Sequence, residues 1–396
     1  MKLIGVNEAT AIIDQFHLSI PSETVSIDHV LGRVLAEDIA ADRDFPPFDR
    51  VTMDGIAIDS SAYLAGKRTF KIEARQHAGE APFALSSSAH CIEVMTGAVL
   101  PQHTDSVIRY EDTEILEGIA ILADDLKIRV NIHRIGSDAK QGEILLPEGT
   151  SINTGSMGVL ASVGAAQVKV HGKPIITIIS TGDELVEIGS IPAPHQIRQS
   201  NATAIGSLLK PFAKAIRHLH IPDDIESLNL KIASVLAETD VLVLAGGVSK
   251  GKKDFLPEVL AHLGVKKHFH GVAQRPGKPF WFGTFGTKAV FALPGNPVSS
   301  FMCATRYVKP WLQKNLKYPM TSGKAVLTAN INFKPSLTYF LPVVLANQND
   351  EMQATPLETK GSGDFIGLAK TNAFLELPAK EEELFAARNV FDYWLF

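Results

Sequence analysis

The stretch IITIISTGDEL, residues 175–185, decides the fold class of this chain. Its first six residues form a nearly continuous apolar run, which is typical of a strand buried on both faces of a parallel sheet. A loop with a glycine and two carboxylates follows at once. The stretch therefore predicts a central strand of an α/β sheet, with polar residues gathered at the carboxyl end of that strand.

The same alternation of strand and helix continues up to residue 316. VLVLA and KAVFAL are further apolar runs of strand length, and apolar residues recur at helical spacing between them. This order predicts an open, mostly parallel sheet that helices cover on both faces. The expected strands lie at 175–180, 215–221, 241–245 and 288–293, and the expected helices at 201–213, 225–238, 255–263 and 298–308.

The regions on either side of the α/β block show a different pattern of residues. Residues 6–16 carry apolar side chains at helical spacing, and Asn7 is the expected N-cap of this helix. Strand-like runs follow, namely TFKIEA, CIEVM, SVIRY, IAILA and KIRVNI, and more of them occur within 324–396, together with one helical stretch at 364–371. The expected domains are 1–45 together with 140–172, then 46–139, 173–318 and 319–396.

Composition and charge exclude several classes of protein. The 396 residues carry a formal net charge of −5, so no global basic field draws the chain to nucleic acid or anionic lipid. The first residues turn polar too soon for a signal peptide, and no apolar run approaches the roughly 20 residues that span a bilayer. Cys91 and Cys303 form no CxxC pattern, so we expect two buried, unpaired thiols. These features predict a soluble, cytoplasmic, multidomain protein.

Three glycine-containing loops follow the predicted strands of the α/β block. They are STGDEL (180–185), GGVSKGKKD (246–254) and LPGNPVSS (293–300). Ligands of open α/β sheets bind beyond the carboxyl ends of the strands, where glycine backbones and helix N-termini attract anions. Ordinary turns use the same residues, but three such loops at one sheet edge favour a binding site. The run Lys250, Lys252 and Lys253 either reinforces an anion site or forms a solvated surface.

The carboxylates of these loops predict a cation. Asp183, Glu184 and Asp254 would repel one another if they gathered, and Mg²⁺ suits an oxygen-rich site beside substrate phosphates. The alternative for Asp254 is a helix cap, because a helix is expected to start directly after it, and the two roles are compatible.

A fourth segment, RPGKPFWFG (275–283), carries two cations between prolines. Arg275 and Lys278 on such a fixed turn suit a phosphate or another oxyanion, although a simple hairpin entry would have the same sequence. No Ser-His-Asp arrangement is indicated, and GGVSKGKKD does not match a Walker loop.

The passage DFPPFDRVTMDGIAID, residues 44–59, is unusual in a different way. Pro46 and Pro47 fix two backbone dihedrals and push the preceding residues out of the helical region. We therefore expect a stiff, extended segment that holds Asp49 or Asp54 in place for a chemical purpose.

Together these motifs resemble the MoeA family of molybdopterin molybdenumtransferases, which includes the E domain of gephyrin. The resemblance covers nearly the whole chain. It rests on GRVLAEDI, PPFD…MDGIA, MTGAVLP…DSVIRYED, STGDEL, GGVSKGKKDF, PGKPFWFG, LPGNPVSSF and GSGDFIGLAKTNAFLELP, in the order and spacing of the family.

The resemblance implies a fold and a reaction. The implied fold is a multidomain α/β protein with a three-layer, MogA-like pterin-binding domain, a β-rich domain that carries the MDG loop, an elongated N-terminal linker domain, and a small C-terminal β-barrel-like domain. The implied reaction inserts molybdate into adenylylated molybdopterin with loss of AMP, and it uses Mg²⁺. The family also implies a homodimer whose active site crosses the interface, and it raises a MogA-type adenylyltransferase as a partner.

The resemblance carries functional roles to individual positions. Asp54 of the MDG motif matches the molybdate and metal end of the site, and Thr96 and Asp138 match further site positions. The expected catalytic residues are Asp54, Asp183, Glu184, Asp254 and Lys278, and the expected metal ligands are Asp54, Glu184 and Asp254. The expected substrate-binding residues are Thr96, Asp138, Gly246, Gly247, Ser249, Arg275, Pro294, Gly295, Asn296, Pro297 and Ser299.

The chain departs from the family pattern at several positions. Arg50 and Val51 stand where Asn-Ser is usual, His133 replaces a common arginine, and Arg275 replaces a lysine. Further departures are Ile56 for tyrosine, Ser137 for glutamate and Gln199 for aspartate. They leave open a non-catalytic pterin-binding or scaffolding paralogue, and a tungstate-inserting variant also stays open. A phosphate-ester hydrolase is disfavoured, because no nucleophile or two-metal ligand set is evident.

Overall fold

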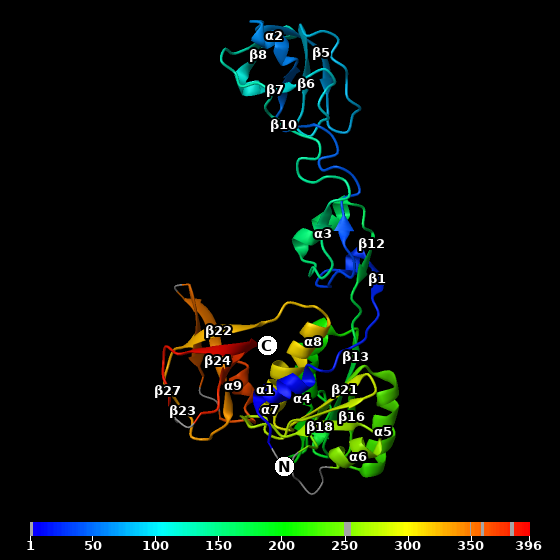
Figure 1. Ribbon diagram of the computed structural model, residues 1–396, viewed down its shortest axis with the longest axis vertical. Helices are drawn as coiled ribbons and strands as arrows, with labels where there is room; N and C mark the ends of the chain where they lie inside the picture. The colour runs from blue at the N-terminus through cyan, green and yellow to red at the C-terminus, as the bar shows by residue number, and fades with distance from the viewer. Residues whose placement is uncertain (1–2, 249–254, 349, 358–359, 381–383) are drawn as a thin grey trace. The chain divides into compact units, whose positions relative to one another are not determined.

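The computed structural model describes residues 3–248, 255–348, 350–357, 360–380 and 384–396. The chain forms two compact units (Figure 1). The first contains Met1–Thr24, Gly32–Val34 and Lys169–Phe396, and the second contains Val25–Leu31 and Leu35–Val168. The division falls within strands β1 (Glu23–Ser26) and β12 (Gln167–Val170). No helix among the described residues is long and apolar enough to cross a membrane.

The first unit is built on a six-stranded sheet with the order β16-β13-β17-β21-β20-β18. The first four strands of this order run parallel, because β13 pairs with β16 and β17, and β17 pairs with β21. The last two strands of the order are antiparallel to their neighbours, because β20 pairs antiparallel with β21, and β18 pairs antiparallel with β20. The prediction of a mostly parallel sheet is thus confirmed. The strand bounds are β13 Ile175–Thr181, β16 Ala215–Ile221, β17 Val241–Ala245, β18 Lys266–His270, β20 Trp281–Phe285 and β21 Lys288–Leu293.

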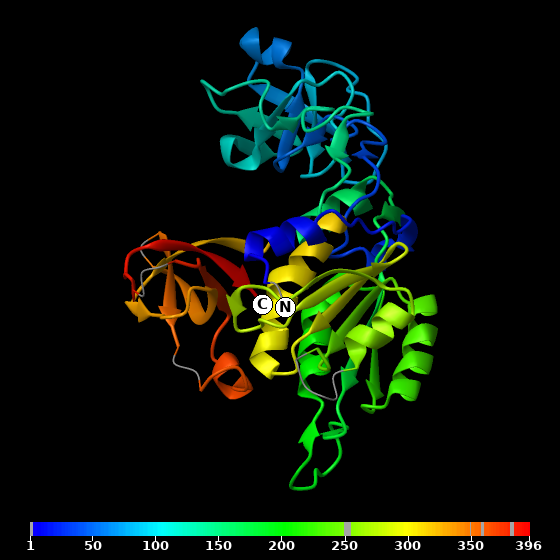
Figure 2. The ribbon, with the colours of Figure 1, turned by 60° about the horizontal axis from the view of Figure 1, so that its bottom comes forward.

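Helices cover both faces of this sheet, as the apolar runs predict (Figure 1, Figure 2). Along β13 the side chains alternate, since Ile176 and Ile178 join one buried cluster and Ile179 joins the other. Helices α5 (Ile225–Glu238) and α6 (Leu256–His262) pack on the face of Ile179. The opposite face is covered by α1 (Val6–Ile13), α4 (Ser200–Leu209) with the 3-10 turn η3 (Lys210–Phe212), α7 (Pro297–Cys303) and α8 (Lys309–Asn315).

One expectation for these helices was wrong, and one expected helix contains a turn of a different type. The first helix begins at Val6 behind Gly5, which is extended with ψ 161° and makes no side-chain cap, so Asn7 lies inside the first turn. The helix expected at 298–308 changes register at its end, because Ala304–Val308 forms a π-helical turn, η4, between α7 and α8. The apolar spacing of a helix and of a π-turn is too similar to separate them from sequence.

The C-terminal part of the first unit is a β-barrel. The short strands after residue 319 predict a β-rich domain, and the family resemblance implies the barrel. Its strands have the order β19-β24-β25-β22-β28-β26, and an additional β24–β26 pairing closes a ring of five strands. The bounds are β19 Gln274–Arg275, β22 Ser322–Leu327, β24 Thr338–Gln348, β25 Glu351–Pro356, β26 Ala373–Leu377 and β28 Val390–Leu395, with β23 (Ile331–Asn332), β27 (Leu384–Phe385) and helix α9 (Phe365–Leu368) outside the ring.

A buried ion pair joins the barrel to the π-turn. Arg306 Nε donates to Glu376 Oε2 at 2.7 Å, and their side chains are 6% and 15% exposed. Trp394 Nε1 donates to the same oxygen at 2.8 Å, and the Arg306 guanidinium lies 4.1 Å from the Trp394 ring. The barrel and the α/β sheet therefore pack through a shared interior within this unit.

The second unit is β-rich. Its main sheet has the order β7-β4-β6-β5-β9-β8, and β4 is buried on both faces because Ile56 and Ile58 join one core while Ala57 joins another. The bounds are β4 Gly55–Ile58, β5 Thr69–Gln76, β6 His90–Val94, β7 Ser106–Arg109, β8 Thr113–Leu116 and β9 Ile119–Leu122. Smaller elements are η1 Ile27–His29, β2 Ile39–Ala40, β3 Arg50–Val51, α2 Ser60–Leu64, η2 Tyr110–Asp112, β10 Ile132–His133, β11 Ile144–Leu146 and α3 Thr154–Ser162.

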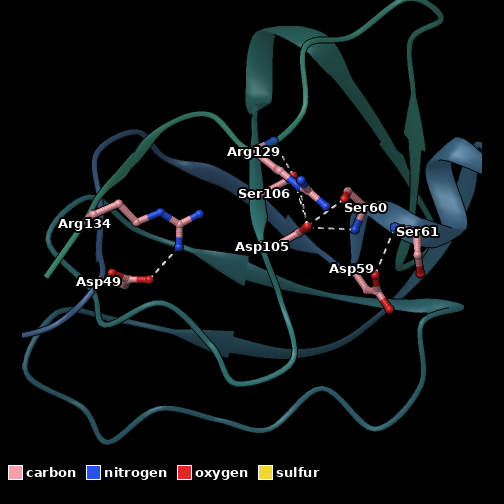
Figure 3. A network of polar contacts seen from close by, with 8 residues as sticks. All are labelled: Asp49, Asp59, Ser60, Ser61, Asp105, Ser106, Arg129 and Arg134. Atoms are coloured by element: carbon pink, nitrogen blue, oxygen red, sulfur yellow. Dashed lines mark hydrogen bonds and ion pairs between the residues drawn. The ribbon is translucent and has the colours of Figure 1, made fainter.

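The run KIRVNI does not form the expected strand. Arg129 and Asn131 adopt positive φ of 57° and 58°, and the Arg129 N–H donates to Ser106 Oγ at 2.6 Å. Figure 3 shows that Asp105 holds this segment, because its carboxylate accepts from the Ser60 backbone and hydroxyl and from Arg129. These side-chain bonds replace the ladder bonds that a strand would make.

Candidate active site

A cavity of about 810 Å³ lies at the carboxyl ends of β13, β17 and β21. This is the edge where the three glycine-containing loops leave the sheet. The barrel contributes to the wall as well. The described lining residues include Thr181, Gly182, Glu184, Arg198, Asn201, Gly246, Gly247, Gln274, Arg275, Lys278, Pro294, Gly295, Asn296, Pro297, Ser299, Tyr339 and Ser362.

Two glycines bring the backbone close to the first loop. Gly246 and Gly247 have φ of +119° and +69°, and a Cβ on either would come within 3.1 Å of Thr181 Oγ1. Only glycine fits both the conformation and the space. The Gly246 N–H donates to Leu293 O at 3.1 Å, so the second loop is tied to the strand that carries the third.

The third loop is fixed from both sides. Asn201 Nδ2 donates to Gly295 O at 2.7 Å from the start of α4. On the other side, Asn296 Nδ2 donates to Ser362 Oγ at 3.0 Å, and the Val298 N–H donates to Ser362 O at 2.9 Å. The barrel segment around Ser362 thus helps to set the rim of the cavity.

The positively charged side chains of two residues line the cavity, one at the end of β19 and one in the turn that follows it. Arg275 and Lys278 are exposed and flank Pro276 and Gly277, with a cis peptide bond before Pro276. The Arg275 guanidinium lies 5.9 Å from the Phe333 ring, which stacks on Tyr339.

The Phe333–Tyr339 stack has its ring centroids 4.3 Å apart and an interplanar angle of 7°. Burial raises the pKa of Tyr339, and the charge of Arg275 opposes that rise. The Tyr339 phenol therefore stays protonated. The turn with Arg275 and Lys278 presents positive charge to the cavity, which Glu184 also lines.

Two polar atoms in residues of the cavity wall lack partners. Thr181 Oγ1 and Asn201 Oδ1 are buried and make no hydrogen bond with any residue that the structure describes. Unpaired buried polar atoms are costly, and a bound polar ligand is one way to satisfy them. The cavity therefore combines cations, backbone amides and unsatisfied polar atoms, which suits a ligand with both an anionic and a polar part.

A second cluster of polar residues lies in the other unit. Thr96 donates to Asp54 Oδ1 from its backbone N at 2.6 Å and from its hydroxyl at 2.7 Å. The hydroxyl first, and the backbone N–H second, lower the pKa of Asp54. Asp54 is exposed, so this carboxylate is ionised and open to solvent.

A different aspartate of the 44–59 passage is held by hydrogen bonds. Asp49 accepts from Arg134 Nη1 at 2.6 Å and from the Ile135 N–H at 2.8 Å, as Figure 3 shows for the arginine. Gly136 N donates to Pro46 O at 2.9 Å. Asp49 thus braces the loop, and Asp54 is the aspartate of this passage that stays open to solvent.

Two departures from the family pattern contact each other in this cluster. Arg50 donates to His133 Nδ1 at 2.9 Å, and His133 Nε2 lies 2.7 Å from Asp138 Oδ1. The chain Arg50–His133–Asp138 therefore links both substituted positions to the predicted site residue Asp138.

Comparison with known proteins decides the family. Models of the MoeA N-terminal region (domain I and II), of a probable molybdopterin binding domain and of the MoeA C-terminal region (domain IV) match residues 4–164, 177–314 and 324–396. The chain belongs to the MoeA family. A molybdopterin molybdenumtransferase of Synechocystis sp. is 40% identical over 99% of this chain and 100% of its own length. The Bacillus subtilis protein of the same name is 31% identical over 95% and 90%.

A solved MoeA-family structure has the same fold. The molybdopterin biosynthesis MoeA protein of Pyrococcus horikoshii superposes with a TM-score of 0.84 and 31% identity, covering 100% of this chain and 99% of the other. The MoeA fold expected from the sequence is therefore confirmed. The domain boundaries 1–45 with 140–172, 46–139, 173–318 and 319–396 stay a prediction.

Most site residues expected for a MoeA protein lie at the cavity. The residues that line it are Glu184, Gly246, Gly247, Arg275, Lys278, Pro294, Gly295, Asn296, Pro297 and Ser299. Asp54, Thr96 and Asp138 belong to the other unit. Asp183 is not among the described lining residues, and its Oδ1 accepts from the Asp223 N–H at 3.2 Å.

Some expectations fall on residues outside the described ranges. These are Ser249, Lys250, Lys252, Lys253 and Asp254. Within the described ranges, no three His, Cys, Asp or Glu side chains gather in a way that could hold a metal ion. The metal set Asp54, Glu184 and Asp254 therefore stays a prediction.

Several lining residues were not predicted from the sequence. Thr181 lies in the quoted motif STGDEL, directly after the predicted strand 175–180, and Asn201 begins the expected helix 201–213, so both polar side chains were a usable signal. Gln274 directly precedes the Arg275–Lys278 turn but gives no signal of its own. Tyr339 reaches the cavity through the pairing of β24 with β19, where it stands opposite Arg275.

Proposed function

We propose that this MoeA protein inserts molybdate into the dithiolene of adenylylated molybdopterin and releases AMP. Membership of a family of molybdopterin molybdenumtransferases makes it a transferase with molybdopterin and molybdate as substrates. The observation that carries the finer proposal is the cavity at the strand ends, which gathers Arg275, Lys278 and two unsatisfied polar atoms beside glycine-rich loops. An adenylylated pterin has the matching parts, a phosphoanhydride and a polar ring system.

Different residues of the cavity bind different parts of this substrate. Lys278 and Arg275 neutralise the phosphoanhydride, and the backbone of Gly246 and Gly247 allows its close approach. Thr181 and Asn201 offer hydrogen bonds to the polar ring system. The thiolates that receive the metal belong to the substrate, which fits the burial of both cysteines, Cys91 and Cys303.

Mg²⁺ fits the carboxylates that this proposal assigns to it. Asp54 is ionised because of Thr96, and its Oδ2 makes no hydrogen bond with a described residue. Hard carboxylate oxygens of this kind are the ligands that Mg²⁺ prefers. We assign Asp54, Glu184 and Asp254 to the ion, and we assign Asp183 to the catalytic residues. When bound, Mg²⁺ would neutralise charge on the phosphoanhydride and the oxyanion.

The protein is further proposed to act as a homodimer in the cytoplasm. Asp54, Thr96 and Asp138 of one protomer would complete the cavity of its partner. The support for this arrangement is that, among the described residues, most of the expected site residues line the cavity, whereas Asp54, Thr96 and Asp138 belong to the other unit. The adenylylated substrate would come from a MogA-type adenylyltransferase.

Release of AMP from adenylylated molybdopterin tests this function. Purified protein with Mg²⁺ is expected to release AMP only when molybdate is added. Tight binding without release under any condition would instead identify a pterin-binding or scaffolding paralogue. Release that responds to tungstate but not to molybdate would identify the tungstate-inserting variant.

A further inference from the structure

A buried glutamine lies directly before the turn that carries the two cations of the cavity. Gln274 is 0% exposed, although it lines the cavity wall through its place in β19. Its backbone pairs with the barrel, where Gln274 stands opposite Thr338 in a parallel register. A fully buried amide must find hydrogen-bond partners inside the protein.

The Gln274 amide joins the turn to the π-helical segment. Its Nε2 donates to Gly277 O at 3.0 Å and lies 3.5 Å from Cys303 Sγ. Its Oε1 accepts from the hydroxyl of Tyr307, which is buried in η4. A carbonyl oxygen can only accept, so the NH₂ group must face Gly277, and the orientation of the amide is fixed.

The turn itself has no room to move toward the helix. Gly277 has φ +89°, and a Cβ there would come within 2.7 Å of Cys303 Sγ and 2.8 Å of Met302 Cε. One side of the turn thus packs on α7, and the Gln274 amide holds the carbonyl group of Gly277. Lys278 follows the held carbonyl directly, and Arg275 directly follows Gln274.

The residue that donates to this amide, Tyr307, lies in the π-turn η4. Its ring packs on Phe280 with the centroids 4.7 Å apart, and its hydroxyl points to Gln274. π-turns inside helices often occur at functional sites, because the extra residue redirects a side chain. Here that side chain holds the residue next to the cations.

We propose that Gln274, supported by Tyr307, is a positioning residue that sets where Lys278 and Arg275 present their charge to the anionic part of the ligand. The assignment of that ligand as a phosphoanhydride rests on the proposed function. Gln274 itself touches neither substrate nor reacting atoms in this role. Without its amide, Gly277 O and the Tyr307 hydroxyl lose their partner, and the turn is free to leave the cavity wall.

A double-mutant cycle with inorganic pyrophosphate tests this role. Titration calorimetry on the full-length protein compares Gln274→Met, Lys278→Ala and the double variant with the unmodified chain. We expect each single variant to bind pyrophosphate about 10-fold more weakly, because a charge-assisted contact is lost or misplaced. In the Lys278→Ala background, Gln274→Met should then weaken binding clearly less than 10-fold, because the part of its effect that acts through Lys278 is already lost.

Gln313→Met is the matched control. Gln313 is 1% exposed and donates from Nε2 to Pro319 O at 2.6 Å, but it does not line the cavity. This variant should lower stability without changing pyrophosphate affinity. If Gln274→Met does not fold, Tyr307→Phe takes its place in the cycle, because it removes only the hydroxyl that fixes the amide.

Three outcomes would overturn the inference. They are additive effects of Gln274→Met and Lys278→Ala, unchanged affinity in Gln274→Met, and no pyrophosphate binding by the unmodified protein. Release of AMP is measured on the same preparation. If the effects of Gln274→Met and Lys278→Ala on pyrophosphate affinity are coupled but no molybdate-dependent release of AMP is seen, the role of Gln274 is supported and only the proposed function is contradicted.

Discussion

Thr96 donates both its backbone N–H and its hydroxyl to the same oxygen of Asp54, at 2.6 and 2.7 Å. The two bonds occupy Oδ1 and leave the other oxygen of the carboxylate open. They also hold the carboxylate in its charged form, because they lower the pKa of Asp54. An exposed aspartate that is fixed and ionised in this way is suited to a cation or to a substrate proton, and the predictions begin with it.

Removal of the Thr96 hydroxyl should shift the pH dependence of activity. In Thr96→Val only the backbone bond to Asp54 remains, so the pKa of Asp54 rises toward its ordinary value. Because the lowered pKa keeps the carboxylate charged as the pH falls, the acid limb of AMP release should move to higher pH in the variant. The charged Asp54 likewise stabilises the folded protein. This contribution is fully present above the pKa that Asp54 has in the unfolded chain, and it is lost as the pH falls through the pKa of Asp54 in the folded protein.

The pH profile of AMP release measures this shift. Thr104→Val is the matched control, because its hydroxyl donates to Pro101 O at 2.7 Å in the same unit but contacts no carboxylate. An unchanged acid limb in Thr96→Val would show that Asp54 does not control the reaction.

Lys278→Ala should weaken binding of the phosphorylated pterin by about 10- to 100-fold, as expected for the loss of one charge-assisted contact. The effect should shrink at high salt, because screening weakens the contact in the unmodified protein. Affinity at two salt concentrations measures both effects. Lys267→Ala removes an exposed cation from β18 outside the cavity lining and should change nothing. Equal affinity of Lys278→Ala and the unmodified protein would remove Lys278 from the site.

Gly277→Ala should be far more damaging than Gly286→Ala. Both glycines have positive φ, +89° and +58°, but only at Gly277 would a Cβ meet neighbouring atoms below 3.0 Å. Gly286→Ala should therefore cost about 1 kcal/mol of strain, and Gly277→Ala about 1–3 kcal/mol more through overpacking. Denaturant unfolding measures the difference. Equal losses would mean that the turn can move away from α7.

Glu376→Ala should destabilise the first unit by about 3–5 kcal/mol, because it leaves Arg306 buried without its partner. Glu238→Ala removes the partner of Arg217 in an exposed pair of similar length, 2.8 Å, and should cost about 0–1 kcal/mol. Thermal unfolding of both variants makes the comparison. A small loss in Glu376→Ala would contradict the account of how the barrel packs on the π-turn.

The α/β part of the fold could be predicted because its signals are local and strong. Val241–Ala245 and Ile225–Glu238 have the expected bounds, since a buried strand must be apolar throughout and α5 carries its own cap at Asp224. KIRVNI was misread for a local reason too. Its alternating pattern competes with side-chain bonds to Ser106 and Asp105, and those bonds determine the backbone.

The site was predictable where chemistry and strand ends coincide in the sequence. Lys278 and the glycines at 246–247 were found in this way. Gln274 and Tyr307 were not, because nothing in their neighbourhood shows that a π-turn would bring them together. Ser362 reaches the rim by tertiary contact alone. Residues that support a site from behind give no sequence signal of their own, whereas those that face the ligand often do.

Co-expression of two inactive variants tests the central claim most directly, namely that Asp54 of one protomer serves the cavity of its partner. Asp54→Ala and Lys278→Glu, each with its own affinity tag, are assayed alone and as purified mixed dimers for molybdate-dependent release of AMP. A purified mixed dimer should show about half of the normal activity, because one of its two sites is intact and the other carries both substitutions. No activity above that of the single variants would contradict the account.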